Sequence, residues 1–266
     1  DATIHARGVT VIQRSGSVHQ QELALALIGA DGVWSTVRQR LFPQVQPRFS
    51  GLIAWRGTCD ATHLPCEYTS RRVQLWMGPN AHIVAYPISG ARQINVIAVV
   101  PGAWNSPGFN AGADANELKN VFAPPTWPGP ARMLIDAVND WRKWALFTVP
   151  DGGGWTDGTF ALLGDAAHAM LPFAAQGAGM AIEDAAVLSQ CLSEGAGQSA
   201  ADISAALRRY AYLRRPRVAR VQRTARRNGM IYHLKGPMAY TRDLAIKAMD
   251  PNRMLALQDW IYDWRL

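Results

Sequence analysis

A glycine–aspartate pair at the end of an apolar segment is the strongest chemical signal in this chain. Gly164-Asp165 closes an apolar strand expected over 159–163, and ligands in open α/β sheets bind at the carboxyl ends of the strands. Small residues follow, and Gly177 and Gly179 then open a long helix. The unpaired N–H groups and the dipole of a helix N-terminus favour an anion at such a place. A glycine-rich start that serves only packing is the alternative, because a GxG without the full GxGxxG pattern is a weak signal.

A second pair, Asp31-Gly32, repeats this arrangement near the N-terminus. It follows an apolar segment at 22–28, whose two apolar faces predict one buried strand, and a polar turn is expected before this strand at 14–17. Gly32 frees the backbone to turn, and a short helix is expected over 34–41 with Ser35 near its start. Asp31 can therefore belong to a ligand site, or it can simply cap this helix, as Asp-Gly pairs often do. The residues alone favour the cap.

Turn residues and alternating apolar positions predict an antiparallel sheet in the middle of the chain. Its expected strands are 51–59, 71–77, 81–88 and 93–100. The further expected elements are helices at 113–123, 130–139 and 179–192, strands at 143–149 and 159–163, and a mostly helical remainder after 195–199. The apolar face of the long helix is expected at Ala181, Ala185, Leu188 and Leu192. A sheet inserted into an α/β layer in this way is a common means of forming a ligand cleft.

The composition fits a globular protein of one or two domains, with 266 residues of which 48% are hydrophobic. The formal net charge of +7 favours anionic partners without choosing among nucleic acid, acidic lipid and small anions. The three cysteines, Cys59, Cys66 and Cys191, lack metal-binding spacing and are expected to be free thiols. No apolar run reaches the roughly 20 residues of a membrane helix, and no signal peptide is recognised. We therefore expect a cytoplasmic protein without a metal ion or a membrane span.

Nine arginines crowd the region between residues 208 and 227. Basic helices of this kind can bind nucleic acid. Here, however, the arginines fall all around the expected helix, and apolar or aromatic side chains lie among them at Tyr210, Leu213, Val218 and Val221. This pattern favours a long solvated helix that packs one side against the rest of the protein, so we expect no nucleic-acid partner.

Taken together, the two aspartate segments resemble a known family. In order and spacing, 27–38 and 162–185 are similar to the DG and GD fingerprints of the single-component FAD-dependent aromatic hydroxylases. Three further segments, at 51–57, 78–88 and 259–264, look most like the branch that contains salicylate hydroxylase, 3-hydroxybenzoate 6-hydroxylase and 6-hydroxynicotinate 3-monooxygenase. The resemblance covers nearly the whole chain.

The resemblance implies specific roles for residues of the GD segment. Asp165 would hydrogen-bond the ribityl chain of FAD, and Pro172 would lie beside the reactive edge of the flavin ring. The backbone at the start of the long helix would face the flavin N1–C2=O edge, which becomes negative on reduction and is stabilised by a helix N-terminus. The residues concerned are Gly177, Ala178, Gly179 and Met180.

For the DG segment, the resemblance implies that Asp31 would organise the pyrophosphate region and the approach of the nicotinamide cofactor, while Arg38 would support the loop. The family's FAD domain opens with a strand–GxGxxG–helix unit, which also supplies the acidic residue for the adenosine ribose. Nothing in the 266 residues matches this unit. We therefore expect a partial FAD-binding domain, whose retention of FAD depends on the missing segment.

His82 and Tyr86 are four residues apart in an expected strand and so point to one face. On the residues alone, a satisfied core histidine and a packing tyrosine are the more common outcome. In the resembling branch, a histidine and a tyrosine at this spacing line the substrate pocket, and the histidine is placed to take the phenol proton. Histidine suits a base that works near neutral pH.

The expected fold is α/β with mixed α+β character: a partial FAD-binding, Rossmann-like domain, an inserted antiparallel-sheet substrate domain and a helical C-terminal region. The expected parts are 1–42 (partial FAD-binding domain with the DG segment), 43–150 (substrate-binding sheet domain), 151–195 (FAD-binding domain with the GD segment) and 196–266 (helical region).

The resemblance implies an enzyme that uses FAD, NAD(P)H and O2 to hydroxylate a phenolic or hydroxylated aromatic acid, with a possible homo-oligomer as its assembly. The cofactor supplies the oxidative chemistry and the protein positions it. Three alternatives stay open: a flavin enzyme of the same fold with a non-aromatic substrate, an inactive truncated fragment, and a basic nucleic-acid-binding module.

Overall fold

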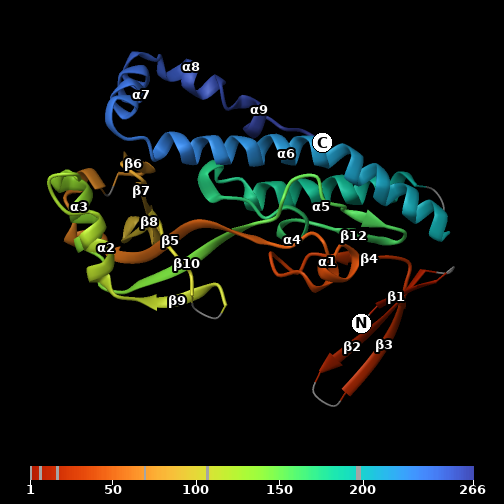
Figure 1. Cartoon of the computed structure of the whole chain (residues 1–266). Coiled ribbons are helices and arrows are strands. Elements are labelled where there is room, and N and C mark those ends of the chain that lie inside the picture. The colour runs from red at the N-terminus through yellow and green to blue at the C-terminus, as the bar shows by residue number, and fades with distance from the viewer. Residues whose placement is uncertain (1, 6–7, 16–17, 69, 106–107, 196–198) are drawn as a thin grey trace. The chain divides into compact units, whose positions relative to one another are not determined.

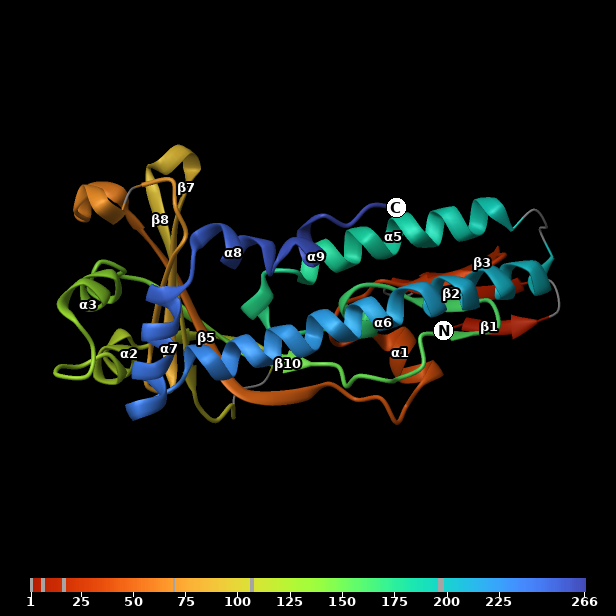
Figure 2. The same ribbon diagram turned by 90° about the horizontal axis from the view of Figure 1, so that it is seen from above.

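The computed structural model describes residues 2–5, 8–15, 18–68, 70–105, 108–195 and 199–266 (Figures 1 and 2). Its strands are β1 (Ala2–His5), β2 (Gly8–Ser15), β3 (Val18–Ala24), β4 (Leu27–Gly29), β5 (Arg48–Asp60), β6 (Gln74–Gly78), β7 (Ala81–Ile88), β8 (Gln93–Pro101), β9 (Asn110–Ala113), β10 (Trp141–Thr148), β11 (Thr156–Asp157) and β12 (Phe160–Leu162). Its α-helices are α1 (Thr36–Leu41), α2 (Ala115–Val121), α3 (Gly129–Asp136), α4 (Asp165–His168), α5 (Gly177–Glu194), α6 (Ala200–Tyr232), α7 (Gly236–Ala248), α8 (Pro251–Ala256) and α9 (Asp259–Tyr262). Short 3₁₀ turns are η1 (Ala61–His63), η2 (Cys66–Tyr68), η3 (Ser89–Ala91) and η4 (Pro172–Ala174).

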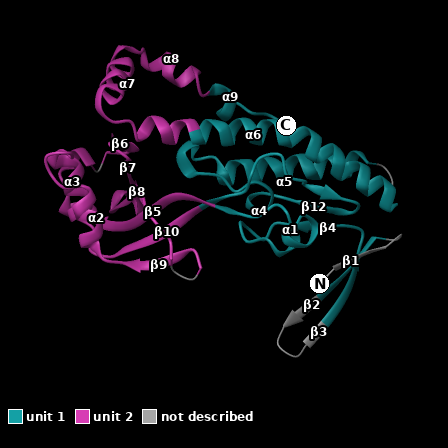
Figure 3. Cartoon of the chain, viewed as in Figure 1, with its two compact units in different colours: residues 1–48, 147–226, 259–266 teal, residues 49–146, 227–258 magenta. Residues whose placement is uncertain are grey.

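The chain forms two compact units, coloured separately in Figure 3. Unit 1 comprises residues 1–48, 147–226 and 259–266, and unit 2 comprises residues 49–146 and 227–258. The C-terminal helical region is therefore shared, because most of α6 belongs to unit 1 whereas α7 and α8 belong to unit 2.

Unit 1 is built around a small sheet in which β4 and β12 run parallel, with β11 antiparallel to β12. The helices α5 and α6 pack together through an apolar cluster that includes Leu162, Met180, Leu188 and Leu207. Tyr210 of α6 is fully buried, and its hydroxyl donates to the Leu162 carbonyl at 3.0 Å. This contact ties α6 directly to the end of β12, where Gly164-Asp165 follows.

The single buried strand predicted over 22–28 is wrong. The antiparallel partner of β2, β3, ends at Ala24, and the chain then enters a different sheet as β4. Leu23 is 68% exposed and Leu25 is 45% exposed, so the outer half of the segment is not core. The two parts of the segment pair with different strands in different sheets, and the extended conformation is interrupted at residues 25–26 between them. The predicted turn before it includes residues 16–17, which lie outside the described residues.

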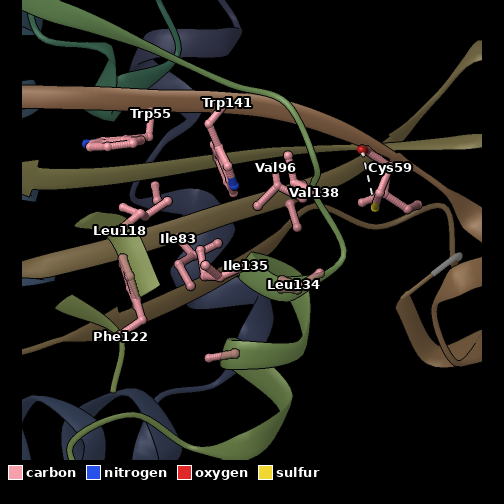
Figure 4. Packing of buried hydrophobic residues seen from close by; sticks show 14 of the residues in the cluster. Trp55, Cys59, Ile83, Val96, Leu118, Phe122, Leu134, Ile135, Val138 and Trp141 are labelled. Carbon is pink, nitrogen blue, oxygen red and sulfur yellow. Dashed lines mark hydrogen bonds between the residues drawn. The ribbon is translucent and has the colours of Figure 1, made fainter. Parts of the chain in front are cut away.

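Unit 2 contains a six-stranded sheet in the order β6-β7-β8-β5-β10-β9. Alternate residues of its strands point into a core that α2 and α3 cover. Figure 4 shows Ile83, Val96 and Trp141 of the strands packed with Leu118 of α2 and Leu134 of α3. All five are nearly inaccessible. The opposite residues of β7 and β8 therefore lie on the other face of the sheet.

The predicted antiparallel sheet is confirmed, and the pairings β5–β8, β6–β7 and β7–β8 are antiparallel throughout their described registers. The α/β fold with an inserted sheet and a helical C-terminal region is also confirmed. Within the described part of the chain, no helix is both long and apolar enough to cross a membrane, and no group of three metal-ligating side chains comes together. Cys59 and Cys191 are buried free thiols, and Cys66 is exposed.

Candidate functional site

The segment after β12 holds an exposed carboxylate on a tightly constrained turn. Gly164 has φ 61° and ψ −139°, a conformation that residues with a Cβ rarely adopt. A Cβ at this position would also lie 3.1 Å from the Cβ of Ala181. Asp165 follows as the first residue of α4 and is exposed. Among the described residues, none forms a hydrogen bond or an ion pair with its side chain. The carboxylate of Asp165 is thus free to accept hydrogen bonds from a ligand.

A buried charge network holds this turn from behind. Asp184 is fully buried, and its Oδ2 accepts from the backbone N–H of Gly164 at 3.1 Å and lies 2.5 Å from His168 Nε2. Its Oδ1 accepts from Arg214 Nε at 2.7 Å, and Arg214 Nη1 also donates to Glu183 at 2.6 Å. Burial alone would raise the pKa of Asp184, but the hydrogen bonds and charges of His168 and Arg214 lower it. Asp184 therefore stays ionised and fixes the turn before Asp165.

The network extends to the C-terminal segment of unit 1. Arg217 donates to both oxygens of Glu183, each at 2.6 Å. The same guanidinium donates to the carbonyls of Trp260 and Ile261 at 2.8 and 2.9 Å, and it lies over the ring of Trp264. The segment 259–264, singled out in the sequence for its resemblance, is thereby attached to α6.

These contacts correct two sequence expectations. The core face predicted for the long helix included Ala185, which is exposed, whereas Glu183 and Asp184 are buried. The arginine-rich helix α6 was expected to keep its arginines in solvent and to pack one side inward. One side does pack inward, but this buried side includes Arg214, which is only 1% exposed. The two acidic residues do fall on the same helical stripe as Met180 and Val187, and carboxylates on a buried stripe need charged partners such as arginine. That coincidence is the sequence signal that could have identified them.

The start of α5 presents an open backbone surface. Its N-cap residue, Gln176, makes no side-chain capping bond, and the first turn contains no acidic residue. Ala178 is exposed, and a Cβ placed on Gly177 would meet no atom within 4 Å. Met180 is fully buried and anchors the turn in the apolar cluster of unit 1. The first-turn N–H groups of an uncapped helix of this length favour an anionic or electron-rich ligand.

The turn before α5 contains the predicted Pro172. This proline is exposed and begins η4, and the next residues lead to Ala175, whose φ is 51°. The left-handed conformation of Ala175 is uncommon for a residue with a Cβ. Strained backbone of this kind is often found at ligand-binding loops.

Asp31 accepts hydrogen bonds from the first turn of α1, whose N-cap residue is Ser35. Its Oδ2 accepts from the backbone N–H groups of Thr36 and Val37 at 2.7 and 3.3 Å, and from the Thr36 hydroxyl at 3.0 Å. Burial would raise the pKa of Asp31, but hydrogen bonds, including one from Ser35, outweigh it and lower the pKa. Asp31 remains exposed at the loop surface, so these hydrogen bonds leave one side of the carboxylate accessible.

Arg38 joins the loop of Asp31 to the loop of Asp165. Its side chain is fully buried and donates to the carbonyls of Val33 at 2.5 Å, Val45 at 3.2 Å and Ala166 at 2.7 Å. Val33 belongs to the first loop and Ala166 to α4. Because one guanidinium satisfies carbonyls of both segments, Arg38 fixes the two aspartate loops relative to each other within unit 1.

His82 and Tyr86 lie in unit 2, on the sheet face opposite the core. His82 is 2% exposed, and burial followed by the charge of His233 lowers its pKa to about 3. The Nδ1 of His82 lies 2.7 Å from Nε2 of His233, a partner that sequence reasoning missed because 151 residues separate the two. Tyr86 is half-buried and lies four residues further along β7.

A shallow cleft of about 380 Å³ adjoins Tyr86. Arg71, Arg72 and Val73 line one part of it, and Pro87 continues the wall beside Tyr86. Two exposed guanidinium groups and a phenol ring give this cleft the chemistry to hold a small anionic aromatic compound. His82 does not line this cleft, so the predicted substrate residues His82 and Tyr86 do not both face it.

Sequence comparison decides the family. A family described as "FAD binding domain" matches residues 5–225. The chain belongs to this family. The match includes both aspartate loops and all of the six-stranded sheet, so the DG and GD segments are parts of an FAD-binding fold.

Relatives within the FAD-binding family are aromatic monooxygenases by name. The chain is 38% identical over 257 residues to 3-amino-4-hydroxybenzoate 2-monooxygenase PtmB3 of Streptomyces platensis, covering 96% of this chain and 62% of that protein. It is 34% identical over 262 residues to 3-hydroxybenzoate 6-hydroxylase of Polaromonas naphthalenivorans, covering 97% and 62%. The chain thus spans less than two thirds of the length of these relatives.

Solved structures agree with this family. A salicylate hydroxylase in complex with its substrate superimposes with a TM-score of 0.83 at 28% identity, covering 100% of this chain and 67% of that one. Klebsiella pneumoniae HpxO, complexed with FAD and uric acid, superimposes with a TM-score of 0.78 at 24% identity, covering 96% and 63%. The second likeness concerns the fold alone.

Proposed function

We propose that the full-length protein is an FAD- and NAD(P)H-dependent monooxygenase that hydroxylates a phenolic aromatic acid with O2. The two relatives named above and the salicylate hydroxylase structure support this class of reaction. When bound, FAD supplies the transfer of electrons from NAD(P)H and the activation of O2. The residues of this chain bind the cofactor, orient the substrate and manage its proton.

The single observation that carries the proposal is the exposed carboxylate of Asp165, which has no partner among the described residues and lies on a turn that buried charges fix. The groups present fit the flavin end of FAD. A ribityl chain offers hydroxyl donors that a carboxylate accepts, and the uncapped start of α5 offers N–H groups to the electron-rich edge of a flavin. We assign the first role to Asp165 and the second to the backbone of Gly177, Ala178, Gly179 and Met180.

We assign supporting roles to the remaining residues of unit 1. Pro172 would flank the flavin ring, since it is exposed on the turn that leads into α5. Asp31 would contribute to the pyrophosphate region, because its carboxylate accepts from the first turn of α1 and still remains exposed. Arg38 would hold the loops of Asp31 and Asp165 together, because it donates hydrogen bonds to three backbone carbonyls.

Residues of unit 2 would bind the substrate and accept its proton. A phenol becomes a better nucleophile when its proton is removed, and a neutral histidine can take that proton. Burial keeps His82 neutral, so its ring carries one unprotonated nitrogen. Tyr86 would orient the ring, and the arginines of its cleft suit the carboxylate of an aromatic acid.

The flavin site can be tested in the full-length protein with D165A. A hydrogen bond to a charged group contributes about 1.5–3 kcal/mol, so FAD affinity should fall roughly 10- to 100-fold. Because Asp165 is exposed and unpaired among the described residues, the free energy of unfolding should hardly change. Fluorescence titration with FAD measures the affinity, and D157A, an exposed aspartate of β11 in the same unit, is the matched control. Equal FAD affinity in D165A and D157A would remove Asp165 from the site.

A further inference from the structure

Helix α7 of unit 2 is apolar on the face that points away from the rest of that unit. Its Arg242 is buried and donates to the carbonyls of Ile231 and Tyr232 at 3.1 and 3.3 Å, so this side of α7 faces inward. Tyr240 and Leu244 lie two positions before and after Arg242, which places each about 160° around the helix from it. They are 68% and 49% exposed. The outer face of α7 is therefore apolar and exposed.

The apolar surface continues beyond these two residues. Ala248 follows Leu244 by one helical turn on the same face and is exposed, and we call Tyr240, Leu244 and Ala248 the α7 stripe. Helix α8 begins two residues after α7 ends, within the same unit (Figure 3). There Leu255 is 69% exposed and Leu257, at the C-cap, is 57% exposed. Exposed apolar surface of this extent marks an interaction site.

One edge of the α7 stripe carries charges of both signs. Asp243 and Lys247 are four residues apart, so they lie on the same edge of the helix, and both are exposed. Asp243 is paired with its neighbour Arg242 at 2.8 Å. Within the described part of the chain, no acidic side chain pairs with Lys247. The opposite edge carries Thr241 and Ala245, which are uncharged.

These charges favour a second copy of the chain over a lipid surface as the partner of α7. Helices that lie on membranes are rich in Lys and Arg on the polar face, whereas α7 holds an acidic residue, Asp243, beside its stripe. A helix that meets its own copy about a two-fold axis must be complementary to itself, and every contact occurs twice. In an antiparallel pair, one edge of each helix faces the same edge of the other. An acid and a base on that single edge meet this requirement.

The charges also fix where the two-fold axis lies. With the axis level with Ala245, Asp243 of each copy is opposite Lys247 of the other, because both are two residues, or about 3 Å, from the axis. The two Leu244 side chains then lie about 3 Å apart along the helices and pack against each other. Tyr240 of one copy lies beside Ala248 of the other, so a large side chain meets a small one.

We propose that the outer face of α7 is a dimer interface, at which two copies of this chain pack antiparallel through the α7 stripe and through reciprocal Asp243–Lys247 ion pairs. A contact of this symmetry closes after two copies, so the assembly is a dimer and not a filament. The inference does not depend on the proposed function, because none of the residues assigned to FAD or to the substrate lies in α7.

Sedimentation velocity of the full-length protein over a wide concentration range tests the interface. We expect a wild-type dimer. K247D places two acidic residues opposite each other in both symmetric pairs, and D243K does the same with two basic residues, so each should raise the dimer Kd roughly tenfold or more. L244D puts a charge in the middle of the stripe and should give monomers. L213D, at a leucine of α6 that is 47% exposed, is the matched control, and circular dichroism checks the fold of every variant.

Mixing the single variants separates pairing between copies from a local effect on α7. In a heterodimer of D243K with K247D, one copy carries two basic residues on the charged edge and the other carries two acidic ones. Both symmetric pairs are then attractive again. The equimolar mixture and the double variant D243K/K247D should each recover most of the wild-type affinity. If D243K fails to fold, K247D and L244D still provide the test.

Several results would overturn the interface. A wild-type protein that stays monomeric at every concentration would do so. If that monomer co-sediments with phosphatidylglycerol vesicles, α7 binds lipid, and if it does not, another part of the full-length chain covers α7. A dimer that L244D and K247D leave intact uses a different surface and would overturn the proposal as well. A dimer that behaves as expected but hydroxylates no phenolic acid would contradict the proposed function and leave the interface standing.

Discussion

Replacing Asp184 with alanine should destabilise unit 1 far more than an ordinary loss of a salt bridge. The carboxylate is fully buried and accepts from Arg214 at 2.7 Å and from the Gly164 N–H at 3.1 Å, with His168 Nε2 at 2.5 Å. Arg214 is 1% exposed and would keep only Glu183 as an anionic partner. Removing one member of a buried pair leaves an uncompensated charge and costs about 3–5 kcal/mol. We expect D184A to fall in that range.

The same helix offers a control with the same residue types. Asp151 and Arg226 also form an aspartate–arginine pair with α6, at 2.6 Å, but their side chains are 30% and 46% exposed. Water screens such a pair, and its removal typically costs about 0–1 kcal/mol. D151A should therefore be nearly as stable as wild type.

Urea unfolding near neutral pH, followed by far-UV circular dichroism and tryptophan fluorescence, measures the free energies. A double-mutant cycle with D184A and R214M should give a coupling energy on the order of 1–3 kcal/mol. If D184A and D151A cost the same within about 0.5 kcal/mol, the reasoning that a buried network fixes the Asp165 turn is refuted. A coupling near zero would contradict it as well.

Two further predictions concern the glycine of the GD loop and the buried histidine of unit 2. G164A should lower the free energy of unfolding by at least about 1–3 kcal/mol and weaken FAD binding, because the backbone conformation suits only glycine and an added Cβ would meet Ala181. G32A, with φ 77° and no atom within 4 Å of a Cβ, should lower it by only about 1–2 kcal/mol. Thermal denaturation and FAD titration of both variants measure these effects, and a G164A variant more stable than G32A would contradict the prediction. His82 has a folded pKa of about 3, below the unfolded value near 6.5, so its contribution to stability is present above pH 6.5 and is lost as the pH falls. Between about pH 7.5 and pH 5 this loss should be roughly 2 kcal/mol, and H82Q should abolish it; identical pH dependence of unfolding in wild type and H82Q would show that His82 titrates normally.

Local patterns explain why the sheet of unit 2 could be predicted so closely. The bounds of β7 agree with the predicted strand 81–88 because residues with positive φ, Asn80 before it and Ser89 and Gly90 after it, end the extended conformation on both sides. These are short-range signals that a single sequence carries. The segment 22–28 was misjudged because its apolar alternation is equally compatible with two sheets, and only the pairing partners decide between them.

Local sequence signals likewise identify only some residues of the candidate site. Asp31 and Asp165 could be found because glycine neighbours and apolar strands mark them in the sequence. Asp184 could not, since a carboxylate in a helix is ordinarily exposed, and it becomes a core residue only through Arg214, 30 residues further on. His233 lies 151 residues from His82, so only the folded chain brings the two rings together. Contacts of this range depend on tertiary packing and leave no periodic signal.

The most direct test of the account is product analysis with labelled oxygen. Full-length protein reconstituted with FAD would be incubated with NAD(P)H, ¹⁸O₂ and a panel of phenolic acids that includes salicylate and 3-hydroxybenzoate. The account predicts that at least one phenolic acid stimulates NAD(P)H oxidation and yields a ring-hydroxylated product with one labelled oxygen atom. A protein that retains FAD but forms no labelled aromatic product with any member of the panel would contradict it.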